Sequence, residues 1–126
     1  KNWWWIARAY LVINDLLKKE NIETVHAENG LLAVEEIKRN EQDYDLILMD
    51  VQMPVMNGLE ATQEIRKFNK NLQIFALTAS STTEQKNKVY DAGMNDFLTK
   101  PIDPNEFVKK IKKALVNIKN KKISAN

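Results

Sequence analysis

The chain of 126 residues contains no cysteine, one histidine, three glycines and three prolines. Without cysteine it can form neither disulfides nor a thiolate nucleophile nor a zinc site built on sulfur. No apolar run approaches the roughly 18 residues that a membrane-spanning helix needs, and the N-terminus has no signal-peptide pattern. A formal charge of +2 selects neither nucleic acid nor a membrane surface as a partner. These absences favour a cytoplasmic globular domain.

Glycine-rich phosphate-binding loops are absent as well. Neither G-x-G-x-x-G nor G-x-x-x-x-G-K-[ST] occurs in the sequence, which counts against dinucleotide binding and P-loop nucleotide binding. A small flavodoxin-like cofactor binder is disfavoured as well, because the sequence has no recognisable loop to hold its phosphate.

Apolar residues recur in two kinds of pattern along the chain. Continuous apolar runs, which are typical of strands covered on both faces, stand beside segments with the three- and four-residue spacing of helices. The predicted strands are 22–27, 44–50, 72–78 and 96–99, and the predicted helices are 6–21, 31–40, 59–68, 81–93 and 104–118. Strands that alternate with helices predict an α/β fold with a parallel sheet and helices on both faces.

Three of the predicted strands end in residues that can handle an anion. Asp50 follows one buried run, Thr78 ends the next, and Lys100 follows the last. The carboxyl ends of parallel strands meet at one edge of the sheet, where ligand chemistry belongs. Each residue alone is more often structural, but together they predict a site in which Asp50 is a nucleophile for a phosphoryl group. Lys100 would supply a positive charge and Thr78 a hydroxyl to that group.

The segments "DLILMDVQMPVMNGLEAT", "ALTA" and "DFLTKP" resemble the signature blocks of response regulator receiver domains, the phosphoacceptor modules of two-component signalling. The likeness runs from about Ile6 to Ile118 and is closest in wording to the receivers of hybrid histidine kinases. It implies a doubly wound, five-stranded parallel sheet with five helices and the flavodoxin-like strand order 2-1-3-4-5. Residues 1–119 would form the domain, with an atypical first strand at 1–5 and a flexible tail at 120–126.

The resemblance also implies roles for individual residues. Asp50 would accept a phosphoryl group from a histidine kinase or a histidine phosphotransfer domain, and Thr78 would move toward that group. Lys100 would pair with Asp50, and the rotamer of Phe97 would report the phosphorylation state. The domain would then be a switch acting through the surface of its fourth helix, fifth strand and fifth helix, and at most it would catalyse its own phosphorylation and dephosphorylation.

Two further expectations follow from the same resemblance. The bond from Lys100 to Pro101 would be a cis peptide. Mg²⁺ would be held by Asp50 and by the backbone carbonyl of Gln52, together with two adjacent acidic residues that end the first strand.

The acidic pair is missing from this chain. Counting back from Leu16 and Leu17 places it at Trp4 and Trp5, and no Asp or Glu precedes Asp15. Indole offers Mg²⁺ neither an oxygen nor a charge, so we expect weak metal binding and slow or absent phosphorylation.

Four explanations of this N-terminal segment are open: an altered or artefactual sequence joined to a natural receiver, a deliberate redesign, a natural receiver that signals without phosphate, or an error in the count. The alternative function is accordingly a phosphorylation-deficient binding module with the receiver fold. Such a module could hold a partner or a second copy of itself through the tryptophans. Neither reading predicts contact with nucleic acid or membrane.

Overall fold

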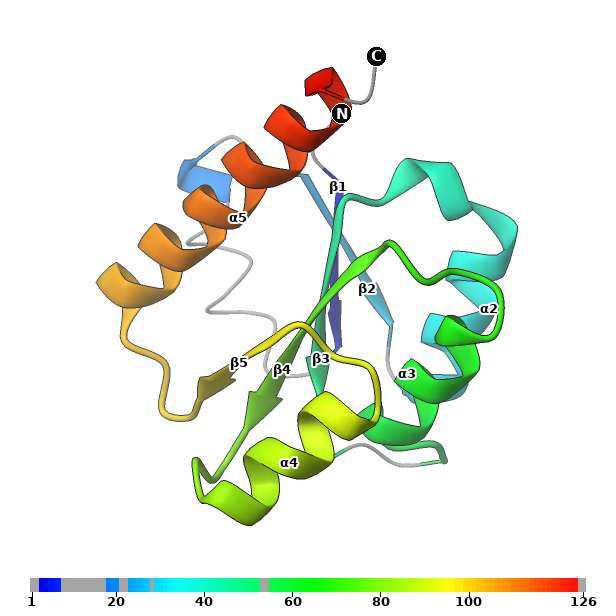
Figure 1. Cartoon of the computed structure of the whole chain (residues 1–126), viewed down its shortest axis with the longest axis vertical. Coiled ribbons are helices and arrows are strands. Elements are labelled where there is room, and N and C mark those ends of the chain that lie inside the picture. Colours follow the sequence, from blue (N-terminus) through cyan, green and yellow to red (C-terminus); the bar gives the residue numbers. More distant parts are fainter. Residues whose placement is uncertain (1–2, 8–17, 21–22, 28, 53–54, 125–126) are drawn as a thin grey trace.

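A parallel sheet forms the centre of the protein in a computed structural model, which describes residues 3–7, 18–20, 23–27, 29–52 and 55–124. The strand order is β2-β1-β3-β4-β5 (Figure 1). The strands are β1 (Trp3–Ala7), β2 (Glu23–Ala27), β3 (Leu46–Asp50), β4 (Gln73–Thr78) and β5 (Asp96–Thr99). The predicted α/β class with a parallel sheet is confirmed.

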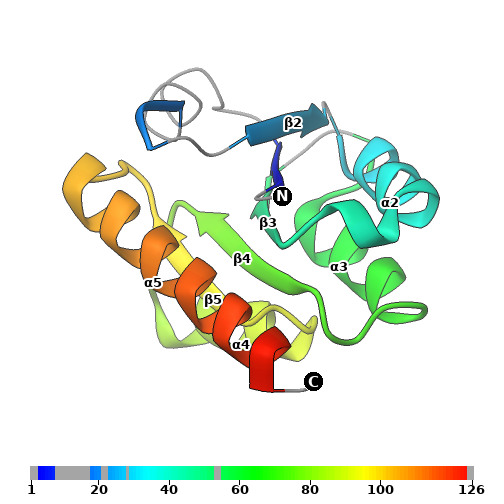
Figure 2. The ribbon, with the colours of Figure 1, turned by 90° about the horizontal axis from the view of Figure 1, so that it is seen from above.

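Helices cover both faces of this sheet. They are α2 (Gly30–Arg39), α3 (Gly58–Arg66), α4 (Thr83–Asp91) and α5 (Pro104–Ser124), with a short 3₁₀ turn, η1 (Glu41–Asp43), after α2. Seen from above, α5 lies across one face, whereas α2 and α3 lie on the other (Figure 2). Among the described residues, no helix is long and apolar enough to cross a bilayer.

The continuous apolar runs divide between two cores. Ile47 and Met49 of β3 join the cluster that contains buried residues of α2, α3 and α4, whereas Leu46 and Leu48 join the cluster under α5. Successive side chains of a strand point to opposite faces, so a strand between two helical layers must be apolar at every position. All five residues of β3 are buried, as the sequence predicts.

Helix α4 is attached to this core by few side chains. Val89 is its one buried residue, and Ala92 follows directly after the helix at 6% exposure. Gly93 then adopts a positive φ of 105°. The helix predicted at 81–93 is thus present as α4, and few buried side chains attach it to the sheet.

Two predicted boundaries are wrong. Ile6 was expected to begin a helix, but Ile6 and Ala7 belong to β1, and most of the segment 6–21 lies outside the described residues. Helix α5 continues to Ser124, although an end near Ile118 and a tail at 120–126 were expected. Neither glycine nor proline follows Pro104, and lysine is a good helix former, so nothing in the sequence ends the helix earlier.

Candidate functional site

Asp50 and Lys100 meet at the carboxyl edge of the sheet. Nζ of Lys100 donates to Oδ2 of Asp50 at 2.6 Å, and the backbone N–H of Gln52 donates to Oδ1 at 2.9 Å. The Asp50 side chain is 4% exposed, whereas that of Lys100 is 33% exposed. A nearly buried carboxylate is thus held by a cation that still reaches solvent.

Thr78 ends the neighbouring strand and lies at the same edge. It pairs with Thr99 in β5, and its carbonyl accepts the backbone N–H of Lys100 at 2.8 Å. The Thr78 hydroxyl donates to the carbonyl of Ser80 at 3.1 Å and accepts the Ser80 N–H at 3.2 Å. In this structure, therefore, the hydroxyl is engaged with the loop that leads to α4.

Phe97 lies one strand further along the sheet, among charged and aromatic residues. Its ring meets Tyr90 of α4 edge to face, with centroids 6.3 Å apart. Nζ of Lys86 and Nζ of Lys110 stand 5.3 and 5.7 Å from the ring centroid. Lys110 also donates to the Phe97 carbonyl at 3.1 Å, so α4, β5 and α5 meet at this side chain.

The expected cis peptide bond is present between Lys100 and Pro101. This bond directly follows the residue that pairs with Asp50. The sequence predictions for Asp50, Lys100 and Pro101 therefore agree with the structure in position and contact.

Two glycines, Gly30 and Gly58, fix the loop after Asp50. The N–H of Gly58 donates to the carbonyl of Val51 at 3.1 Å, and the N–H of Gly30 donates to the carbonyl of Met56 at 3.1 Å. A Cβ at Gly30 would stand 2.2 Å from the Met56 oxygen. Each glycine stands directly before a predicted helix in the sequence, but only the packed structure shows what it contacts.

The residues that the structure describes do not fit a Mg²⁺ site. Among the described residues, no group of three or more Asp, Glu, His or Cys side chains could hold a metal. Oδ1 of Asp50 already accepts the Gln52 N–H, and Oδ2 accepts Lys100. Strand β1 offers no carboxylate of its own. A hard divalent cation would therefore meet one side-chain ligand that is already engaged.

The placement of Trp4 and Trp5 at the end of the first strand is wrong. Trp4 pairs with Leu46 and Trp5 with Ile47, which are four and three residues before Asp50, and β1 continues to Ala7. The tryptophans form the body of β1 and do not stand at the edge where Asp50 lies. The count assumed a first strand that ends before Ile6, and the register shows a strand that ends later.

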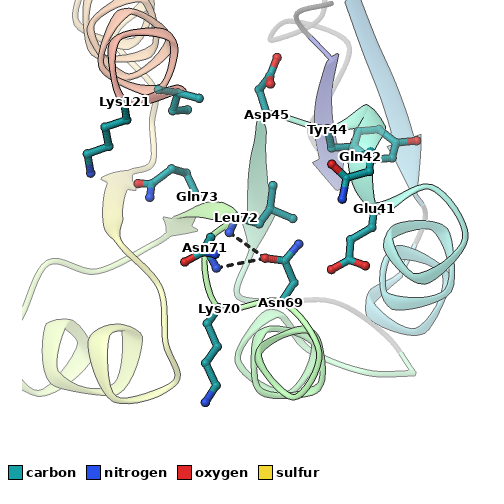
Figure 3. A pocket seen from close by; sticks show the side chains of 11 residues that line it. Glu41, Gln42, Tyr44, Asp45, Asn69, Lys70, Asn71, Leu72, Gln73 and Lys121 are labelled. Atoms are coloured by element: carbon teal, nitrogen blue, oxygen red, sulfur yellow. Dashed lines mark hydrogen bonds between the residues drawn. The ribbon is translucent and has the colours of Figure 1, made fainter. Parts of the chain in front are cut away.

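A groove of about 640 Å³ lies at the other end of the sheet. Its walls come from the segments before β3 and β4 and from the end of α5 (Figure 3). Asn69 shapes one wall, because its Oδ1 accepts the N–H groups of Asn71 and Leu72, both at 3.0 Å. Since the groove is at the amino ends of the strands, it is separate from the Asp50 edge.

Comparisons with known proteins agree with this geometry. The model of the response regulator receiver domain matches residues 8–112. Hybrid signal transduction histidine kinase M of Dictyostelium discoideum is 42% identical over 107 residues, which is 81% of this chain and 4% of the kinase. The chain spans between 4% and 24% of the length of this kinase, of response regulator mcs4 of Schizosaccharomyces pombe and of sensor protein GacS of Pseudomonas syringae.

Two solved structures are also similar. The receiver domain of sensor histidine kinase PA1611 from Pseudomonas aeruginosa, solved with Mg²⁺ coordinated in its active-site cleft, is 30% identical with a TM-score of 0.80, covering 89% of this chain and 95% of that one. The receiver of the Saccharomyces cerevisiae response regulator Ssk1, solved with the histidine phosphotransfer protein Ypd1, is 35% identical with a TM-score of 0.81. The match covers 88% of this chain and 86% of that one. With the family model matched from Arg8 to Lys112, the chain belongs to the response regulator receiver domains.

Proposed function

We propose that Asp50 is the phosphoacceptor of this receiver domain and that its donor is a phosphohistidine on a partner protein. The observation that carries the proposal is the pairing of a nearly buried carboxylate with the Lys100 ammonium at 2.6 Å. A carboxylate can carry a phosphoryl group as an acyl phosphate, and the Lys100 ammonium places a cation beside the charge that phosphoryl transfer delivers.

The transfer would exchange one bond to phosphorus for another. A bond forms between phosphorus and a carboxylate oxygen of Asp50 while the bond from phosphorus to the imidazole nitrogen breaks. The electron pair of the broken bond stays on the imidazole, which takes a proton from water. Lys100 would then turn from the carboxylate to the new phosphoryl oxygens, and the Thr78 hydroxyl would have to leave Ser80 to reach one of them.

The switch surface that we propose is the junction at Phe97. A movement of Thr78 frees or fills space beside β5, where the Phe97 ring lies between Tyr90 and two lysines. Tyr90 is 47% exposed, so a change in the Phe97 rotamer would alter a surface that a partner can contact. The surface spans α4, β5 and α5, which pack together through few buried side chains of α4.

A second candidate function is supported by the composition of β1. Because this strand brings no carboxylate to the site, the chain as written could act as a binding module with the receiver fold and little phosphorylation. The two candidates differ in one quantity, the amount of phosphoryl group that Asp50 takes up.

Replacement of Asp50 by asparagine tests the proposal. Acetyl phosphate and, separately, phosphorylated Ypd1 are offered to the unaltered chain and to Asp50→Asn, and the intact masses are compared. We expect the mass of one phosphoryl group on the unaltered chain, accumulating slowly, and none on Asp50→Asn, because an amide is not a nucleophile for phosphorus.

The matched control is Asp103→Asn, at an exposed carboxylate after β5 whose side chain accepts the N–H of Asn105. It should be phosphorylated like the unaltered chain. If the unaltered chain takes up no phosphoryl group from either donor while the PA1611 receiver does under the same conditions, the binding module is the correct function.

A further inference from the structure

Strand β1 differs in composition from the strands that share its environment. It lies between β2 and β3 in the sheet. The neighbouring strands β3 and β4, which are covered on both faces, are built mainly from Leu, Ile, Met, Phe and Ala. Trp3, Trp4 and Trp5 are the chain's only tryptophans. Each indole buries about 150–250 Å² when it is fully covered. Three consecutive tryptophans therefore need a larger volume than the mainly aliphatic residues of β3 and β4. The strand also ends without a carboxylate near Asp50.

We infer that the segment from Asn2 to Ile6 is encoded in a displaced reading frame of its gene. Tryptophan has the single codon TGG, asparagine has AAT or AAC, and every isoleucine codon begins with AT. The bases from the end of the Asn2 codon to the second base of the Ile6 codon are therefore fixed, apart from one pyrimidine. Read from that pyrimidine they are TTG or CTG, then GTG, GTG and GAT. They encode Leu-Val-Val-Asp whichever synonymous codons are used.

This alternative product has the physical character that the strand requires. Leucine and valine suit a parallel strand that is covered on both faces, and the final residue is a carboxylate. Its codon overlaps mainly that of Ile6, which is the penultimate residue of β1 and pairs with Leu48. A carboxylate there would lie near the edge where Asp50 ends β3, and it would supply the second carboxylate that the described residues do not offer to a hard cation.

The two frames must join shortly after Ile6. The family model begins to match at Arg8, and β3, β4 and β5 pair with one another in a continuous parallel register. A gain or loss of bases that is not a multiple of three, or a misplaced exon boundary, would lie close to the codon of Arg8. Such a change explains why every block after it keeps its receiver character while the first strand does not.

Peptides of the natural protein test this inference directly. Trypsin cleaves after Lys1 and Arg8, so the chain as written yields the peptide Asn2–Arg8 with all three tryptophans. We expect mass spectrometry of the protein from its source organism to lack this peptide. The transcript should then show the frame change between the codons of Ile6 and Leu16. Detection of Asn2–Arg8 in the natural protein, or a transcript that reads in one frame throughout, would overturn the inference.

Two recombinant variants test its structural consequence. Trp3→Leu, Trp4→Val and Trp5→Val together should raise the melting temperature by several degrees, and Ile6→Asp added to them should bring Mg²⁺ binding that calorimetry detects. Ile6→Asn on the same background is the matched control, with similar size and no charge. A triple variant with a lower melting temperature than the unaltered chain would show that Leu-Val-Val is not the sequence that this strand requires. Equal Mg²⁺ binding by the Ile6→Asp and Ile6→Asn chains would show the same for the final aspartate.

A second observation concerns exposed apolar residues at the start of α2 and in the loop that follows Asp50. Leu31 and Leu32 at the start of α2 are 40% and 43% exposed, and Val55 in the loop before α3 is 78% exposed. The hydrogen bond from Gly30 to Met56 ties the two segments together. These three side chains, called the rim patch here, make up most of the exposed large apolar residues that the described part of the chain presents.

We propose that the rim patch contacts the phosphohistidine protein that serves Asp50, which rests on the proposed function. The reacting atoms must approach to about 3–3.5 Å, so the surface around the donor histidine must cover the edge of the sheet. Val55 lies five residues after the acceptor, in the loop that Gly58 holds against Asp50. A partner that reaches Asp50 therefore lies over Val55, and it needs an apolar face to match the patch.

Val55 makes a distinguishing test possible because it is strained. Its φ of 69° is unusual for a β-branched residue, whereas asparagine tolerates this region. Val55→Asn should therefore raise the melting temperature while it weakens binding to Ypd1 several-fold, and Leu32→Ser should weaken binding without the rise. Val116→Ser, at a 56% exposed residue of α5, is the control and should bind like the unaltered chain.

Binding is measured by calorimetry with unphosphorylated Ypd1, so the result does not depend on phosphoryl transfer. Equal affinity of Val55→Asn, Leu32→Ser and Val116→Ser would overturn the rim patch, as would an unaltered chain that does not bind Ypd1. In either case, phosphorylation of Asp50 by acetyl phosphate would still support the proposed function. Failure of that reaction with the binding pattern intact would instead remove the phosphoacceptor role alone.

Discussion

Replacing Lys100 with methionine should destabilise the fold by about 2–4 kcal/mol, because it leaves a carboxylate inside the protein without its cation. The Asp50 side chain is 4% exposed, and after the substitution one backbone N–H, that of Gln52, would be its remaining observed partner. The expected cost is below that of a fully buried pair, since Lys100 is 33% exposed and water can enter its place.

The reverse substitution should cost less. Asp50→Asn keeps an acceptor oxygen for the Gln52 N–H, and the Lys100 ammonium that loses its partner already reaches solvent. We expect a loss below about 1 kcal/mol. Urea unfolding followed by circular dichroism measures both effects, and the double variant Lys100→Met, Asp50→Asn should recover most of the loss caused by Lys100→Met alone. Equal losses from the two single variants would show that burial of Asp50 does not decide the outcome.

The sequence predicts the strand ends well because they depend on local pattern alone. Asp50 follows a run that is apolar at every position, and Thr78 and Lys100 follow the next two strands. Once the sheet is parallel, topology brings these ends to one edge, as the contact between Lys100 and Asp50 shows. No knowledge of distant packing is needed for that step.

The first strand shows where pattern fails. Isoleucine and alanine follow the three tryptophans at 3–5. No polar residue therefore indicates which side chains face the core or where the strand ends. The strand's limits come from its pairing with Leu46, Ile47 and Leu48, which is a long-range property. A count of residues from the next helix could not replace that register.

The contacts of the two glycines that bound the loop from Val51 to Asn57, called the acceptor loop here, could not be predicted for a related reason. Glycine at the start of a helix is common and needs no special contact, so the sequence gives no sign that Gly30 touches Met56 or that Gly58 touches Asp50. These contacts depend on how α2 and α3 lie against the loop. Only the packed structure shows that the loop from Val51 to Asn57 is bounded by the first residues of two helices.

Substitution of Gly58 by alanine should therefore destabilise the protein by about 2–3 kcal/mol, even though alanine favours a helix over glycine. A Cβ at this position would stand 2.3 Å from the backbone oxygen of Asp50 and 2.9 Å from Cγ of Met49. Backbone cannot move aside as a flexible side chain can, so α3 must shift outward. That shift would stretch the bond from the Gly58 N–H to the Val51 carbonyl, now 3.1 Å.

The same substitution should also slow phosphorylation, since the loop that begins at Asp50 would be displaced with α3. The control is Gln63→Ala on the exposed side of α3, which should leave stability within about 0.5 kcal/mol and phosphorylation unchanged. Urea unfolding and acetyl phosphate labelling provide the two measurements. A Gly58→Ala chain as stable as Gln63→Ala would mean that α3 can move without cost, and the close approach of α3 to Asp50 would then not be what fixes the acceptor loop.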